Sequence, residues 1–172
     1  MRIRFQDGQI IIDISCKINL YLEILAKRLD GYHQIETLMA TAPIYDTLEF
    51  TPQENPSLEF TCRWASGHQA MGTTWRNQRA DSDLYGELPP TEKNLGYRAL
   101  ERIQERYAVG RGAKIVLTKR IPAAAGLGGA SADAAATLIA ASLGWNLNLA
   151  DGQLQELAAE LGSDVPFFLR SS

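Results

Sequence analysis

A glycine-rich segment, Ile121-Pro-Ala-Ala-Ala-Gly-Leu-Gly-Gly-Ala-Ser-Ala-Asp133, separates a predicted strand from a predicted helix. Residues 113–118 have the pattern of a strand, and the alanine-rich residues 130–143 contain no Gly or Pro, which favours a helix. Such a bend leaves its own N–H groups and the first N–H groups of the helix unpaired. With the positive end of the helix dipole, these donors form an anion site. The segment therefore predicts a loop that binds nucleotide phosphates; the alternative is a flexible turn before a helix.

The sequence of the loop differs from two well-known nucleotide-binding motifs. A Walker A loop requires a Gly-Lys pair, and the sequence contains none. The dinucleotide fingerprint G-x-G-x-x-G requires a glycine where this chain has Ser131, and it expects an acidic residue on a strand about 20 residues later. If the loop binds phosphates, it belongs to another class.

The composition is that of one globular domain spanning residues 1–172. Apolar residues make up 45% of the chain and the net charge is −3, so nothing favours nucleic acid or an anionic membrane as a partner. Cys16 and Cys62 do not have metal-like spacing, and reduced thiols are expected. No apolar run approaches the length of a membrane span. These features predict a soluble, cytoplasmic domain.

Two strands are expected near the N-terminus, at residues 10–14 and 17–24. In the second, apolar and polar residues alternate strictly, which predicts a half-buried strand. Its apolar face would carry Ile18, Leu20, Leu22 and Ile24, and its polar face would carry Lys17, Asn19, Tyr21 and Glu23. Lys17 and Asn19 would project about 7 Å apart. An amine and an amide so placed could serve a site, although a solvated strand face explains the pattern equally well.

Asp30-Gly31 predicts a turn before another strand at residues 35–41. Tyr32 and His33 follow at its tip, where an aromatic ring and an imidazole could stack on and hydrogen-bond a flat ligand, or simply contact solvent. Further strands are expected at residues 46–51 and 58–62, and a long surface loop or insertion at residues 63–90.

Helices dominate the second half of the expected structure. Asn94 is a predicted N-cap for a helix at residues 95–107, and Asp151 for a last helix that stops at Gly162. The apolar residues 165–169 predict a buried strand. Asp164, in the connection before it, is a candidate general base or metal ligand, or else the acceptor of an Asx turn.

Four motifs, in the same order, resemble those of the GHMP small-molecule kinases. They are Cys16-Lys-Ile-Asn-Leu-Tyr-Leu22, Arg28-Leu-Asp-Gly-Tyr-His33, Lys119-Arg-Ile-Pro122 with the glycine loop that follows, and Gly162-Ser-Asp-Val-Pro-Phe167. The resemblance is strongest to the branch that acts on a methylerythritol carrying a cytidine diphosphate group. It implies an α+β, two-layer N-terminal domain with a mostly antiparallel sheet and helices on one face, similar to a domain of a ribosomal protein and unlike a doubly wound sheet.

The implied activity is ATP-dependent phosphorylation of the 2-hydroxyl of 4-diphosphocytidyl-2-C-methyl-D-erythritol, in the non-mevalonate route to isoprenoid precursors. Asp164 would be the base, and Lys17 would keep that carboxylate ionised and stabilise charge during transfer. Asn19 would help to position the substrate or a phosphate, Tyr32 would stack on the cytosine, and His33 would hydrogen-bond it.

The resemblance assigns the ATP phosphates to the glycine loop and implies Mg²⁺ as the bridging ion, with Ser131 as its possible ligand. The loop residues are Pro122, Ala123, Ala124, Ala125, Gly126, Leu127, Gly128, Gly129, Ala130, Ser131 and Ala132. Many members have Gly-Gly-Gly-Ser-Ser here. This chain has alanine at positions 130 and 132 and lacks the second hydroxyl.

The family also has a C-terminal domain that helps to close over the substrate, and this chain corresponds to the N-terminal domain alone. By itself it is therefore expected to fold, or nearly so, and to have weak or no kinase activity. Two alternatives remain open: another GHMP kinase, acting on homoserine or a mevalonate derivative, and a non-catalytic module of the same fold that binds a nucleotide or RNA.

Overall fold

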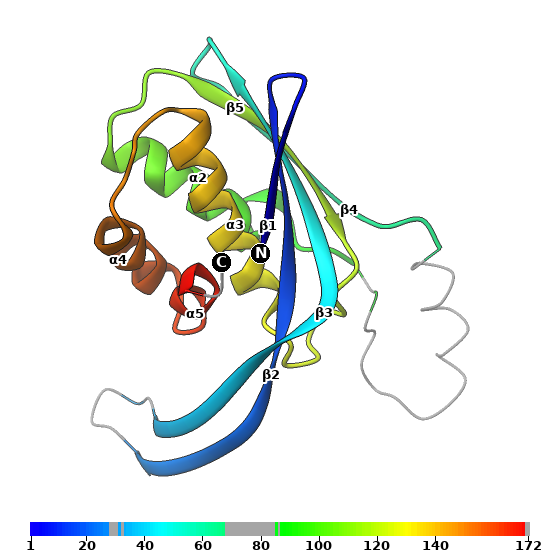
Figure 1. Cartoon of the computed structure of the whole chain (residues 1–172), viewed down its shortest axis with the longest axis vertical. Helices are drawn as coiled ribbons and strands as arrows, with labels where there is room; N and C mark the ends of the chain where they lie inside the picture. Colours follow the sequence, from blue (N-terminus) through cyan, green and yellow to red (C-terminus); the bar gives the residue numbers. More distant parts are fainter. Residues whose placement is uncertain (28–30, 32, 68–84, 86, 171–172) are drawn as a thin grey trace.

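The computed structural model describes residues 1–27, 31, 33–67, 85 and 87–170 and has two layers, a twisted sheet and a group of helices that covers one of its faces (Figure 1). The five strands of the sheet have the order β1-β2-β3-β5-β4. Neighbouring strands are antiparallel except β4 and β5, which are parallel. The strands are β1 (Arg2–Gln6), β2 (Gln9–Lys27), β3 (His33–Gln53), β4 (Leu58–Trp64) and β5 (Gly112–Lys119).

All the helices come after β4 in the sequence. They are the 3-10 turn η1 (Thr91–Lys93), α2 (Leu95–Arg106), α3 (Gly129–Gly144), α4 (Asp151–Leu161) and α5 (Val165–Arg170). η1 and α2 precede β5, and the others follow it. The predicted α+β class, with a mostly antiparallel sheet and helices on one face, is confirmed. No helix in the described part of the chain is long and apolar enough to span a membrane.

The core lies between the sheet and α3. Alternate residues of β2 point into it, so Ile10, Ile12 and Ile14 are buried while Ile11 and Asp13 are half-buried. α3 is apolar on nearly all sides because it lies at the centre of the helical layer, and its alanines let neighbouring helices approach closely. At the start of α2, the Asn94 side chain accepts a hydrogen bond from the Gly96 N–H at 2.9 Å, which confirms the predicted N-cap.

β2 and β3 are each one long strand, where the sequence predicted two strands apiece. They stay paired from Ile10 with Phe50 to Lys27 with His33, and their far halves form a curved arm that extends beyond the helices (Figure 1). Because no helix covers the arm, its apolar residues are exposed: Leu20 is 61% and Ile24 62% accessible. The predicted half-buried strand at residues 17–24 is therefore wrong about burial, and Lys17, predicted on the outer face, is instead buried at 5%.

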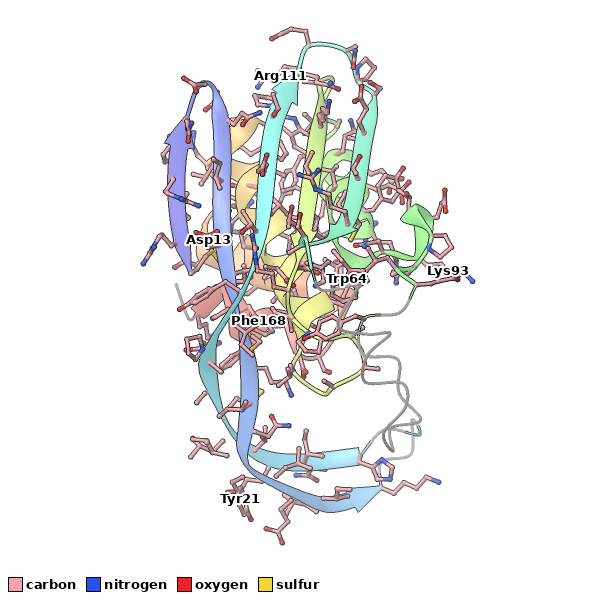
Figure 2. All side chains as sticks on the ribbon, turned by 90° about the vertical axis from the view of Figure 1, so that its right-hand side faces the viewer. Asp13, Tyr21, Trp64, Lys93, Arg111 and Phe168 are labelled. Carbon is pink, nitrogen blue, oxygen red and sulfur yellow. The ribbon has the colours of Figure 1, made fainter. Side chains whose placement is uncertain are left out.

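Register shifts change which residues share a face of the arm. β2 has an extra residue between Asn19 and Tyr21, so Asn19 pairs with Met39 and Tyr21 pairs with Leu38. Since consecutive residues of β3 point to opposite faces, Tyr21 lies on the face opposite Asn19, and it projects from the outer side of the arm (Figure 2). The prediction that Lys17, Asn19, Tyr21 and Glu23 share one face thus fails beyond Asn19.

Three boundary predictions also need correction. Residues 165–169, predicted as a buried strand, form the short helix α5, with Pro166 in its first turn, where a missing N–H costs little. Five apolar residues do not distinguish a strand from a buried helical turn. Asp151 is the first residue of α4, and the N-cap position is Ala150. β1 was not predicted, although Asp7-Gly8, with φ of 48° and 78°, forms the tight turn that joins it to β2.

Most of the predicted 63–90 insertion lies outside the described residues. At its beginning, β4 continues as far as Trp64, whose ring packs edge-to-face on Tyr85 with a centroid distance of 5.2 Å. Near its end, Leu88 and Pro89 line the pocket described below.

Candidate active site

A pocket of about 510 Å³ opens between the glycine loop, the end of β5 and the start of α2. All loop residues from Pro122 to Ser131 line it, together with Lys17 and Asp164. Its other wall is more apolar and includes Trp64, Leu88, Pro89 and Leu95. A cavity with one polar, cationic side and one apolar side has the character of a small-molecule site.

The glycine loop leads directly into α3, as predicted. Gly128 is the N-cap residue, and Gly126 and Gly128 have φ of 71° and 70°, a backbone conformation that glycine adopts without strain. The loop is also attached to β2, because the Lys17 N–H donates to the Leu127 carbonyl at 2.9 Å. The N-terminal end of a 16-residue helix therefore faces the pocket, which is the arrangement that favours an anion.

Lys17 and Asp164 meet at the edge of this pocket, and Asn19, which does not line it, contacts Lys17. The Lys17 ammonium lies 3.6 Å from a carboxylate oxygen of Asp164, a residue in the connection between α4 and α5. The same ammonium donates a hydrogen bond to the Asn19 side-chain oxygen at 3.1 Å. Lys17 is buried, whereas the Asp164 side chain is 38% exposed. A buried cation thus holds a solvent-accessible carboxylate beside the loop that is suited to an anion.

His33 lies at the far end of the arm and is exposed. It is six residues before Met39 on β3, so it shares a strand face with Met39 and with the paired residue Asn19. The arm therefore presents Lys17, Asn19 and His33 on one face, although His33 does not line the pocket. Tyr32 is outside the described residues, and its predicted stacking role stays a prediction.

A buried charged cluster forms part of the inner wall of the pocket, which Lys119 and Asp133 line, and it was not predicted as part of the site. The Lys119 ammonium, at the end of β5, donates to Asp46 of β3 and to Asp133 of α3. Burial raises the pKa of the Asp133 carboxyl to about 7, although Lys119 acts in the opposite direction. The attraction of both carboxylates raises the pKa of Lys119, while burial alone would lower it. One signal was available in the sequence, because Asp133 is the only charged residue between Arg120 and Asp151.

Cys62 also lines the pocket and gives a chemical probe of it. Burial, with the nearby negative charges of Asp133 and Asp46, raises the pKa of its thiol to about 11. We expect Cys62 to react with a thiol-specific disulfide reagent at pH 7.5 roughly 100-fold more slowly than a free cysteine, and more slowly still when a ligand fills the pocket. A Cys62→Ser variant is the control, because the remaining Cys16 is buried. A rate equal to that of free cysteine would contradict this environment.

No group of three or more His, Cys, Asp or Glu side chains in the described part of the chain is placed to hold a metal ion. In kinase sites Mg²⁺ commonly takes most of its ligands from phosphate and water oxygens. The predicted Ser131, which lines the pocket in the first turn of α3, offers one hydroxyl oxygen.

Comparison with known proteins agrees with this arrangement. Residues 94–172 match the GHMP kinases N terminal domain. The chain is 46% identical over 153 residues to a 4-diphosphocytidyl-2-C-methyl-D-erythritol kinase of Pelotomaculum thermopropionicum, covering 89% of this chain and 46% of that protein. It is 39% identical over 159 residues to the kinase of the same name from Bacillus subtilis, covering 92% and 48%. The chain thus spans about half the length of the curated relatives it matches.

Solved structures give the same result. A crystal structure of a 4-(cytidine 5'-diphospho)-2C-methyl-D-erythritol kinase matches with a TM-score of 0.70 and 33% identity, over 94% of this chain and 49% of that one. A homoserine kinase from Cytophaga hutchinsonii matches with a TM-score of 0.61 over 100% of this chain and 45% of that one, at 16% identity, which supports the fold alone. In sequence and fold, the chain is thus similar to the N-terminal half of the 4-diphosphocytidyl-2-C-methyl-D-erythritol kinases, and its residues 94–172 match the N-terminal domain of the GHMP kinases.

Proposed function

We propose that this chain is the ATP-binding half of a kinase that phosphorylates the 2-hydroxyl of 4-diphosphocytidyl-2-C-methyl-D-erythritol, a step in the non-mevalonate supply of isoprenoid precursors. One observation carries the proposal: the glycine loop at the start of α3 and the Lys17–Asp164 pair line the same pocket. A kinase needs such a juxtaposition, because the phosphates of the donor must meet a group that can take a proton from the acceptor alcohol.

In the proposed reaction, the Asp164 carboxylate accepts the proton of the 2-hydroxyl as its oxygen forms a bond to the γ-phosphorus of ATP. The bond from that phosphorus to the bridging oxygen breaks, and ADP leaves with the electron pair. Lys17 lies 3.6 Å from Asp164, close enough to hold that carboxylate in place and to stabilise the negative charge that builds up on the transferring group.

ATP is the proposed phosphoryl donor. Its phosphates would be held by backbone N–H groups of the loop and the first turn of α3, and its base would contact the apolar wall near Trp64 and Leu95. These backbone contacts do not need the hydroxyl that Ala130 and Ala132 lack. When bound, Mg²⁺ would offset the negative charge of the phosphates, with Ser131 as the proposed protein ligand.

The acceptor would lie along the arm. Asn19, already hydrogen-bonded to Lys17, would position the alcohol near Asp164, and His33 and Tyr32 would bind the cytosine. Since the matched relatives are about twice as long, their C-terminal half is proposed to complete the substrate side of the site. A cytoplasmic location is part of the same proposal, supported by two cysteines that form no disulfide.

The direct test is transfer of the γ-phosphoryl group from ³²P-labelled ATP. It would be measured for this chain alone and for an extended chain, in which the C-terminal half of the Pelotomaculum thermopropionicum relative is fused after Ser172. We expect the extended chain to label the diphosphocytidyl alcohol and the chain alone to label it weakly or not at all. Homoserine and mevalonate are the control acceptors. Labelling of either in preference to the diphosphocytidyl alcohol would overturn the proposed substrate, and tight, salt-sensitive RNA binding without ATP binding would overturn the kinase.

A further inference from the structure

The glycine loop is held at both ends by one buried group of side chains. We call Lys119, Asp46 and Asp133 the Lys119 cluster; their side chains are 9%, 0% and 3% exposed. At the start of the loop, one carboxylate oxygen of Asp46 accepts hydrogen bonds from the backbone N–H groups of Arg120 and of Ile121, the latter at 2.9 Å. At its end, Asp133 of α3 accepts from the Lys119 ammonium, which Asp46 also binds.

Apart from the hydrogen bond that the Lys17 N–H donates to the Leu127 carbonyl, the residues between these two ends have few restraints of their own. Positions 123–126 are exposed, and the loop contains three residues with positive φ, at Ala124, Gly126 and Gly128. The position of its amide groups therefore depends on where β5 ends and where α3 begins. The ammonium also lies close to the helix start, because a methyl group at Gly129 would be only 3.3 Å from the Lys119 nitrogen.

A buried cluster of charges is a poor choice for stability alone, since apolar residues of similar volume often stabilise a fold equally well or better. Directed hydrogen bonds from a charged centre do, however, fix geometry. We propose that the Lys119 cluster is a positioning device for the nucleotide loop. Asp46 holds the end of β5, and Lys119, which binds both carboxylates, connects it to Asp133 near the start of α3, at the separation that the phosphates of ATP require. This inference rests on the proposed function.

Asp46→Asn and Asp133→Asn form a matched pair of variants, because each removes one carboxylate charge with little change of shape. In Asp46→Asn, one of the two side-chain oxygens becomes an NH₂ group, which cannot accept a hydrogen bond. The side chain then loses its hydrogen bond either from Lys119 or from the Arg120 and Ile121 N–H groups. In Asp133→Asn, the amide oxygen can still accept from Lys119. Its NH₂ group then replaces the Asp133 oxygen that has no hydrogen-bond partner.

The readout is the dissociation constant of Mg-ATP for the chain, measured by calorimetry where circular dichroism shows each variant to be folded. We expect Asp46→Asn to bind ATP roughly tenfold more weakly and Asp133→Asn to bind within about twofold of the wild type. Loss of a nearby negative charge alone would strengthen binding of an anion in both variants. Equal affinities of folded Asp46→Asn and wild type, or equal weakening in both variants, would overturn the inference.

If Asp46→Asn does not fold, hydrogen exchange of the wild-type chain replaces it. The amides of Arg120 and Ile121 are then expected to exchange at least about 100-fold more slowly than those of Ala123–Ala125, whether or not ATP is present. Equal exchange rates would overturn the inference. A wild-type chain that binds no ATP would instead overturn the proposed function, and this inference with it.

Discussion

Replacing Lys17 with alanine, or Asp164 with asparagine, is expected to lower kcat for phosphoryl transfer by about 10²–10⁴-fold in the extended chain. Asparagine keeps the shape of Asp164 but cannot accept the hydroxyl proton. Alanine at position 17 removes the ammonium that lies 3.6 Å from the carboxylate. The ATP dissociation constant should change far less than kcat, since the loop amides remain. Steady-state transfer assays and calorimetry separate the two quantities.

The control for this pair is Asp151→Asn. Asp151 is an exposed carboxylate in the first turn of α4 and does not line the pocket, so its replacement should leave kcat within about twofold of wild type. Removing Lys17 leaves Asp164 accessible to solvent, and the fold should therefore survive the change. Wild-type kcat in folded Lys17→Ala and Asp164→Asn chains would refute the proposed roles of both residues.

A methyl group at Gly128 is expected to abolish most ATP binding. It would lie 3.0 Å from Cγ of Lys17 and from Cζ of Phe168, closer than nearly all real contacts, and Gly128 has a φ of 70°. In Gly128→Ala, either the loop or the side chains of Lys17 and Phe168 must shift by a few tenths of an ångström, which disturbs the contact between the loop and Lys17. We expect ATP affinity to fall at least about 100-fold and the chain to lose about 2–4 kcal/mol of unfolding free energy, as measured by calorimetry and urea denaturation.

Gly126→Ala separates the two causes. Gly126 has nearly the same φ, 71°, but a methyl group there would meet no atom within 4 Å. It therefore carries the backbone strain without the collision, and we expect it to cost about 1 kcal/mol of stability and less than tenfold in ATP affinity. If Gly128→Ala and Gly126→Ala weaken ATP binding equally, close packing between the loop and Lys17 does not determine ATP affinity.

The elements nearest the glycine loop were predictable from local sequence. The strand before the loop, the helix after it and the N-cap Asn94 all depend on neighbouring residues, and β5, α3 and α2 formed within one or two residues of the predicted positions. The arm was less predictable, because alternating apolar and polar residues indicate a strand but do not indicate whether a helix covers that strand. Nothing in residues 17–24 reveals that the helical layer stops short of Leu20, or that an extra residue there reverses the face of Tyr21.

The site residues divide in the same way. Lys17, Asn19 and the loop were predicted from motifs as site residues, and the structure places Lys17 in contact with Asn19, Asp164 and the loop. The Lys119 cluster was missed because its members come from β3, β5 and α3, and only the tertiary fold makes them neighbours. Asp164 was placed before a strand that is in fact α5. Its position beside Lys17 depends on Val165 and Phe168, which bury that short helix.

The central claim is that the glycine loop and the start of α3 bind the phosphates of ATP beside Lys17. Titration of the ¹⁵N-labelled chain with Mg-ATP tests it most directly, because each backbone amide reports on its own surroundings. We expect the largest shifts at the amides of residues 126–131 and at Lys17, with little change at Gly8 or Gly152, which lie outside the pocket. Saturable shifts that leave residues 126–131 unaffected, or no shifts at all, would contradict it.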